Sequence, residues 1–268
     1  MSITKYYASV GSCIYCGAQE WSEGKSRKLG DEHIVPEGLG GKLLLPEASC
    51  KACEEKTSQF ELEWLRGSFH SARVQKGLGK KRKRSPRFIP LKIQKNGRTV
   101  WKQIPIEKYP ALIVTLVFDT PDILTGCEPI EKELSGGVAV GTMPTFGLHL
   151  QEYLNQGTVS FEPPRNTANS QHLGRMLAKI AHSYTVAELG LNGFKPFLQK
   201  IILGSDIRHL GHYIGGTREI PPKINDVYEV RLTTVQSSDR RNYLMVIIRL
   251  LADVQGMPEY RVIVGEAH

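Results

Sequence analysis

Cys13-Ile14-Tyr15-Cys16 opens a stretch that continues through Asp31-Glu32-His33-Ile34-Val35-Pro36-Glu37-Gly38-Leu39-Gly40-Gly41 and closes with Cys50-Lys51-Ala52-Cys53. Two CxxC pairs supply four thiolates, which complete a tetrahedral shell around one zinc ion and leave no open position. The 33 residues between the pairs exceed the usual spacing of a zinc ribbon, so we expect a folded segment between them. We therefore predict a structural zinc site at Cys13, Cys16, Cys50 and Cys53.

The composition is that of a globular protein. The chain has 268 residues, 40% of them hydrophobic, which suffices for one large domain or two modest ones. The longest apolar runs, 111–118 and 243–248, have strand length and are too short to span a bilayer, and the first residues show no signal-peptide pattern. We expect a cytoplasmic protein without a membrane partner. In such a reducing compartment paired cysteines favour metal over disulfides, and we expect the lone Cys127 to be a core residue.

The charge is basic and uneven. The formal net charge is +8, and residues 1–90 contain 16 basic against 10 acidic side chains. Five consecutive cations, Lys80, Lys81, Arg82, Lys83 and Arg84, follow two glycines and precede Pro86. Such a segment is either a solvated linker or an arm that contacts phosphates; we favour the nucleic-acid-binding arm because a cysteine-rich module precedes it.

The spacing of apolar residues indicates an α+β fold with at least one antiparallel sheet. Helical spacing predicts one helix from Cys53 to Gly67 and another with an apolar face from Leu173 to Tyr184, and Pro196 is expected to interrupt a further helical stretch. Strand-like runs and an Asn96-Gly97 hairpin signal fill 88–162, and strands return over 224–264. We divide the chain into a module over 1–75, a basic linker over 76–90 and an α+β domain over 91–268 for target recognition, sensing or dimerisation.

The Glu32-His33-Ile34-Val35-Pro36 sequence, the glycines after it and a second CxxC that opens a helix resemble the HNH endonucleases, the zinc-bearing branch of the His-metal finger nucleases. The resemblance covers residues 10–66. It implies a small ββα-metal module that hydrolyses DNA, with His33 as general base and Glu32 as ligand of a catalytic Mg²⁺ or Mn²⁺ ion. It also implies a possible homodimer and a role in restriction or phage defence.

The third motif departs from that family. Asn commonly follows the last cysteine there, whereas Glu54 stands at that position here. Glutamate binds hard cations through oxygen, so Glu54 is the favoured second ligand of the catalytic ion. Glu61 is the competitor, because it lies seven residues further on the same helix face and about 10 Å along the axis.

The residue types suit phosphodiester hydrolysis. A histidine can take a proton from water near neutral pH, and a carboxylate-bound divalent ion can stabilise the leaving oxygen. Gly38, Gly40 and Gly41 would let the backbone approach a polyanion closely. Two other functions remain open: a zinc-stapled nucleic-acid-binding protein without catalysis, and a nuclease effector switched on by a ligand of the C-terminal domain.

Overall fold

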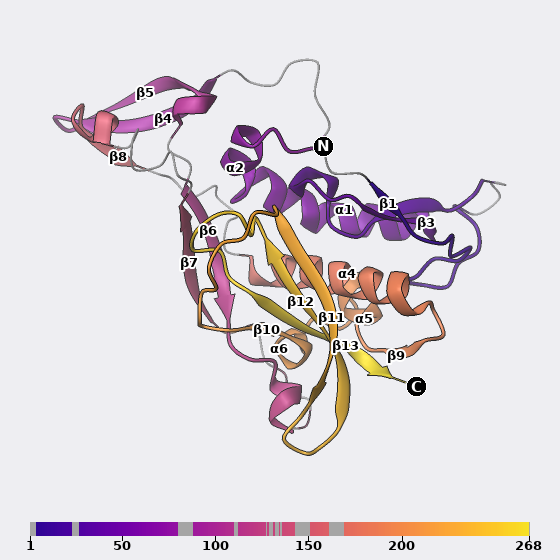
Figure 1. Ribbon diagram of the computed structural model, residues 1–268. Coiled ribbons are helices and arrows are strands. Elements are labelled where there is room, and N and C mark those ends of the chain that lie inside the picture. Colours follow the sequence, from indigo (N-terminus) through magenta and orange to yellow (C-terminus); the bar gives the residue numbers. More distant parts are fainter. Residues whose placement is uncertain are drawn as a thin grey trace.

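The computed structural model describes residues 4–22, 27–79, 88–109, 112–126, 128, 131, 134, 136–142, 151–160 and 169–267. Over these residues the chain is a mixed α+β protein with largely antiparallel sheets, which confirms the predicted class (Figure 1). Lys80 to Arg84 and Cys127 lie outside the described residues, so the arm and the core cysteine stay predictions. No helix in the described part is both long and apolar enough to cross a membrane.

The first part of the chain folds as two antiparallel strands followed by a helix. β2 (Gly30–His33) pairs antiparallel with β3 (Leu43–Ser49), and β1 (Lys5–Tyr6) runs parallel to β3 on its other side. α1 (Lys51–Arg66) begins directly after Cys50 and stops at Gly67, as the helical spacing predicts. A short α2 (His70–Gln75) follows. Glu32 and His33 therefore lie at the end of an edge strand.

The glycines between β2 and β3 pack against the protein itself. A Cβ atom added to Gly41 would lie 1.9 Å from the carbonyl oxygen of Val35, and one added to Gly38 would lie 2.8 Å from Nη2 of Arg73. The Arg73 Nε donates to the Gly38 carbonyl oxygen at 2.5 Å. Gly41 thus needs glycine for internal packing, and a larger residue at Gly38 would displace the Arg73 side chain. The close approach of this turn to a polyanion stays a prediction.

The C-terminal part contains a five-stranded antiparallel sheet. Its path is β10 (Ile214–Gly216), β13 (Tyr260–Ala267), β12 (Asn242–Leu250) and β11 (Tyr228–Gln236), and β9 (Phe194–Pro196) also pairs with β13. The strands predicted in this region are confirmed. The prediction that Pro196 interrupts a helix is wrong: Pro196 ends the short edge strand β9, where its missing N–H is tolerated, and α5 (Gln199–Leu203) begins beyond it.

Shorter elements complete the fold. Asn96 and Gly97 have φ of 51° and 73°, as a two-residue hairpin turn requires, and they join β4 (Phe88–Lys95) to β5 (Arg98–Pro105). β8 (Thr158–Ser160) adds to β4, and this small sheet lies at the edge of the molecule (Figure 1). The remaining elements are β6 (Leu112–Phe118) paired with β7 (Gly136–Thr142), α6 (Leu210–Tyr213), and the 3-10 turns η1 (Glu37–Leu39), η2 (Ile106–Lys108) and η3 (Asp122–Thr125).

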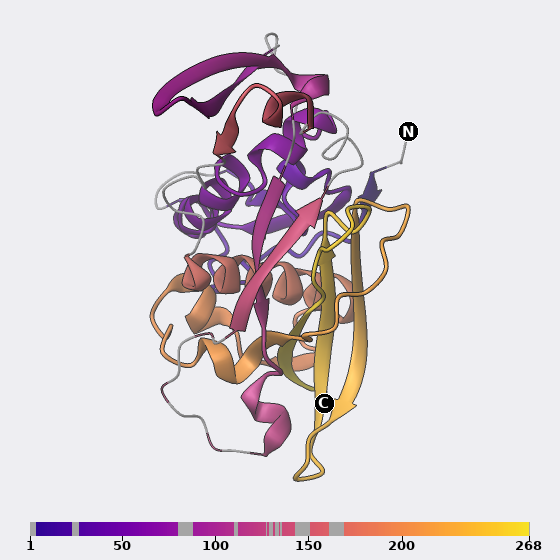
Figure 2. The same cartoon turned by 90° about the vertical axis from the view of Figure 1, so that its left-hand side faces the viewer.

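The long helix α4 (Ser170–Leu189) lies between the strand–strand–helix module and the five-stranded sheet (Figures 1 and 2). Its first turn is capped by Asn169, whose side chain accepts a hydrogen bond from the backbone N–H of His172 at 3.1 Å. The predicted apolar face is buried, but burial extends around the helix to Lys179, His182 and Thr185. Because α4 is covered on both sides, a single apolar core runs across the predicted boundary at 76–90.

His182 on α4 holds the first CxxC pair. Its Nε2 donates a hydrogen bond to the Ile14 carbonyl oxygen at 2.8 Å, and its ring lies 5.9 Å from that of Tyr15. Burial lowers the pKa of His182 to about 4, so the imidazole is neutral at pH 7. An unfolded chain would return that pKa to about 6.5.

We expect acid to destabilise the protein through His182. The contribution of His182 to the free energy of unfolding is fully present above about pH 6.5 and is lost as the pH falls toward 4. Over this range the unfolded chain binds a proton at His182 that the folded chain does not. The loss between pH 8 and pH 5 is about 2 kcal/mol for this group. His182→Gln keeps a donor for Ile14 but does not titrate, so urea denaturation across this range should show a shallower pH dependence. An unchanged slope in the variant would contradict the assignment.

Candidate functional site

The four paired cysteines converge on one point. Cys13 and Cys16 lie on a turn between β1 and β2, whereas Cys50 precedes α1 and Cys53 lies in its first turn. Their four sulfur atoms lie within 4.8 Å of one another, and Cys16 Sγ is 3.6 Å from Cys50 Sγ. Sulfurs bound to zinc at about 2.3 Å are about 3.8 Å apart, while a disulfide needs about 2.0 Å. The cluster can therefore hold a metal ion such as zinc.

Hydrogen bonds within the cluster separate the pKa values of its thiols, and burial raises the pKa of Cys16. A hydrogen bond from the Cys53 thiol lowers the pKa of Cys13 to about 4, and the same contact raises the pKa of Cys53. A thiolate is the form that binds zinc. Among the residues that the structure describes, these four form the only group of three or more His, Cys, Asp or Glu side chains placed to hold a metal ion.

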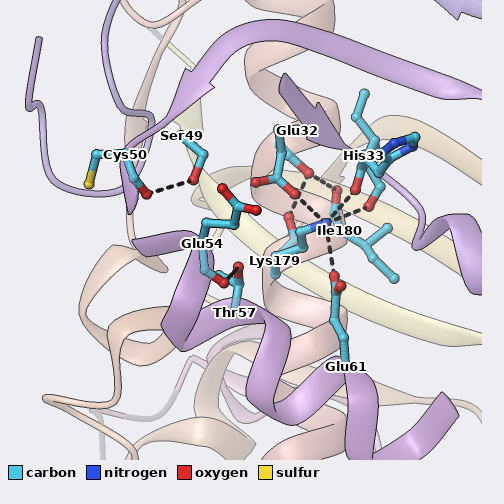
Figure 3. A network of polar contacts seen from close by, with 11 residues as sticks. Glu32, His33, Ser49, Cys50, Glu54, Thr57, Glu61, Lys179 and Ile180 are labelled. Carbon is cyan, nitrogen blue, oxygen red and sulfur yellow. Dashed lines mark hydrogen bonds and ion pairs between the residues drawn. The ribbon is translucent and has the colours of Figure 1, made fainter. Parts of the chain in front are cut away.

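Glu32 and His33 project to different sides of β2, because consecutive residues of a strand alternate in direction. The Glu32 side chain is buried and turned toward α1 and α4, while the half-buried imidazole of His33 points away from that carboxylate (Figure 3). The predicted pair is thus brought to one strand end, with its two side chains in different surroundings.

The Glu32 carboxylate meets a buried ammonium group. Lys179 of α4 forms an ion pair with Glu32, and its Nζ lies 2.9 Å from Oε1 of Glu61 on α1. The same Nζ donates to the backbone carbonyl oxygen of His33. Figure 3 shows the lysine reaching between the strand and the helix. Only 2% of the Lys179 side chain is exposed, so this cation is shielded from water on every side.

The charges inside this group are strongly coupled. Burial alone would lower the pKa of Lys179, but the negative charges of Glu32 and Glu61 outweigh it, so the net pKa is raised and the ammonium stays charged. Burial raises the pKa of Glu61, and Lys179 opposes that effect. Tyr15, inside the first CxxC pair, has its pKa raised by burial and then by the charges of Glu32 and Glu61. The first CxxC pair therefore adjoins the carboxylate pair.

Glu54, the favoured helix ligand, lies in different surroundings. It is exposed in the first turn of α1, and the pKa of its carboxyl is raised by partial burial and by the charge of Glu32, while Arg27 opposes the shift. Glu61, two turns further along α1, is the carboxylate that shares a cation with Glu32. The assignment of Glu54 as a metal ligand stays a prediction.

A divalent ion between Glu32 and Glu61 does not fit this arrangement. Mg²⁺ takes six oxygen ligands at about 2.1 Å and usually keeps several waters. The Lys179 ammonium stands between the two carboxylates, and little solvent reaches them. Glu32 and Glu54 form no cluster with a third His, Asp or Glu side chain of the described residues. We therefore assign no step to a catalytic metal.

Lys179 was not identified as a functional residue from the sequence, although a signal was present. On α4 it lies among Met176, Ala178, Ile180 and Ala181, which are all buried. Lysine is almost never fully buried without a partner, so a lysine within an apolar helix predicts a buried acidic group elsewhere in the chain.

The chain matches no protein-family model, no curated protein and no solved structure.

Zinc content tests the cysteine cluster directly. We expect one zinc ion per purified chain by metal analysis, and loss of that ion in Cys13→Ser or Cys50→Ser, because three thiolates bind much more weakly than four. The zinc-free variants should unfold at a lower temperature, since metal binding contributes to folding free energy. Cys127→Ser is the matched control and should keep one zinc. Full zinc content in both cluster variants would contradict the site.

Proposed function

We propose that this chain is a DNA endonuclease of the HNH type, in which His33 acts as the general base. The observation that carries the proposal is the strand–strand–helix order of β2, β3 and α1, with Glu32-His33 at the strand end and four cysteines beside it. The four thiols would supply the ligands of the structural zinc that the resemblance implies. His33 is half-buried, and the Nδ1 atom of its ring is buried, so the proposal places the proton transfer at Nε2.

The proposed reaction uses His33 in one proton transfer. Its imidazole accepts a proton from water as the water oxygen attacks phosphorus, the bond from phosphorus to the 3′-oxygen breaks, and the released 3′-oxygen takes a proton from solvent. An imidazole suits this role because it exchanges protons near neutral pH. Lys179 fixes the backbone from which the imidazole projects, since it donates to the His33 carbonyl oxygen. In this proposal the His33 imidazole takes part in the reaction, whereas Lys179 only holds the backbone of β2 in place.

A nucleic-acid-binding protein without catalysis is the second candidate. The contact that favours it is the ion pair between Lys179 and Glu32, which engages the carboxylate that the resemblance assigns to a metal. In that case the zinc knuckle and the basic segment Lys80 to Arg84 would bind the phosphate backbone, and nothing would be cut. Excess positive charge in the first 90 residues is common to both candidates.

Cleavage of supercoiled plasmid separates the two candidates. We expect the zinc-loaded chain to convert supercoiled plasmid to nicked or linear DNA, and His33→Ala to lower the rate at least about 100-fold, because general-base catalysis contributes roughly that factor. Reactions with Mg²⁺, with Mn²⁺ and with neither ion cover every metal requirement. Gel electrophoresis gives the rate, and zinc analysis and circular dichroism verify that His33→Ala is folded.

His70→Ala is the matched control, because His70 is an exposed histidine of the same module at the start of α2. It should cleave like the wild type. Equal cleavage by His33→Ala would refute the role of His33. A wild type that retards DNA in a mobility-shift assay but leaves plasmid intact under all three ionic conditions would identify the chain as a binding protein.

The basic segment makes a separate prediction about affinity. Replacing Lys80 to Arg84 by glutamine should weaken DNA binding and flatten its salt dependence, with the slope of log K against log salt falling by up to about 4. Fluorescence anisotropy between 50 and 300 mM salt measures that slope. Lys195→Gln with Lys200→Gln, at two exposed lysines near β9, should leave it unchanged. An unchanged slope in the arm variant would make the segment a plain linker.

A further inference from the structure

We propose that the Lys179 ammonium is the permanent cation of the Glu32–Glu61 pair and stands where a divalent metal would otherwise bind, so this site of the chain takes no metal. The claim rests on contacts of the folded chain and holds whether or not the chain cleaves DNA. It deepens the proposed function in one respect: cleavage, where it occurs, needs no ion between these carboxylates.

The Lys179 ammonium lies among oxygen atoms of the chain, with hydrogen bonds to backbone carbonyls and ion pairs to two carboxylates. An ammonium group has three N–H donors and no acceptor. Three oxygen atoms surround it, from the Glu32 carboxylate, the Glu61 carboxylate at 2.9 Å and the His33 carbonyl, while the Ile34 carbonyl oxygen is more distant at 3.5 Å. Two carboxylates and a backbone carbonyl are also typical ligands of a hard divalent cation. The lysine thus occupies a set of oxygens that suits a metal ion.

The position of Lys179 makes exchange with a metal ion difficult. Its side chain is 2% exposed and that of Glu32 is 7% exposed, so neither can turn its charged end to water while α4 stays packed. Lysine often keeps its ammonium at the surface by extending its methylene chain, but neighbours on α4 such as Met176 and Ile180 are fully buried. A metal ion would have to expel a charged group that has no other place to go.

The charge balance is consistent with a single resident cation. Two carboxylates and one ammonium leave one excess negative charge at this site, and burial favours the protonated form of Glu61 by raising its pKa. The Lys179 ammonium therefore offsets one of the two carboxylate charges without a second positive ion. A divalent ion added beside Lys179 would instead bring two like charges together in a site of low dielectric constant.

Binding of Mn²⁺ to the zinc-loaded, full-length protein tests the proposal. Electron paramagnetic resonance counts free and bound Mn²⁺, and the wild type should show no site that depends on Glu61. Glu61→Gln and the wild type should give the same binding curve. A 1:1 Mn²⁺ site in the wild type that disappears in Glu61→Gln would overturn the proposal, whatever the plasmid assay shows.

Removing the lysine should create the metal site. Lys179→Ala should gain one bound Mn²⁺ per chain, with a thermal midpoint that rises as Mn²⁺ is added, and Lys179→Ala combined with Glu61→Gln should lose both effects. Lys179→Arg keeps a cation and should gain no site. Lys195→Ala, which removes an exposed lysine paired with Glu266, controls for charge alone and should behave like the wild type.

Each outcome decides the question. A folded Lys179→Ala that gains no Mn²⁺ site would overturn the proposal, because the freed oxygens would then not suit a metal. If Lys179→Ala does not fold, the comparison of wild type with Glu61→Gln remains decisive. Failure of the nuclease proposal would appear as intact plasmid, and failure of this one as Glu61-dependent Mn²⁺ binding in the wild type, so the two are distinguishable.

Discussion

A buried ammonium group must be surrounded by oxygen atoms, and this constraint fixes the centre of the molecule. Lys179 contacts Glu32 and the His33 carbonyl on β2, and Glu61 on α1, from the middle of α4. Removing one partner of a buried ion pair typically costs about 3–5 kcal/mol, because the remaining charge is left without compensation. β2, α1 and α4 therefore pack in the arrangement that keeps Glu32, Glu61 and Lys179 in contact with one another.

Two different sets of contacts hold the strands and helix at the start of the chain in place. On one side, four cysteines that could hold a metal ion bring the turn before β2 close to the start of α1. On the other, α4 inserts Lys179 beside β2 and donates from His182 to the Ile14 carbonyl oxygen within the first CxxC pair. The cysteine cluster and the contacts from α4 involve the same short segments. The position of Glu32 and His33 at the end of β2 therefore depends on both. For this reason one apolar core includes residues from both sides of 76–90, the segment that we predicted to be a linker between two domains.

Local patterns made most of the fold predictable. Cysteine spacing identified the metal cluster, helical spacing gave α1 and α4, and Asn96-Gly97 located a hairpin, because each depends on neighbours in sequence. The predicted helix around Pro196 is wrong because helical spacing in a short apolar segment does not exclude a strand. The sequence could not identify Lys179 as the partner of Glu32 for a different reason. Lys179 lies 146 residues from His33, the neighbour of Glu32, and a contact over that distance leaves no periodic signal in the sequence.

The chemistry of a short motif therefore depends on charges supplied by the rest of the chain. An acidic residue followed by histidine can bind a divalent ion only if the carboxylate is free and the site admits water, since Mg²⁺ dehydrates reluctantly. Here the carboxylate is buried against an ammonium group, whereas the imidazole one residue later is half-buried on the other face of the strand. The alternation of side chains along β2 thus gives the two residues different surroundings: the Glu32 carboxylate faces the Lys179 ammonium of α4, and the half-buried His33 side chain lies on the other face of the strand.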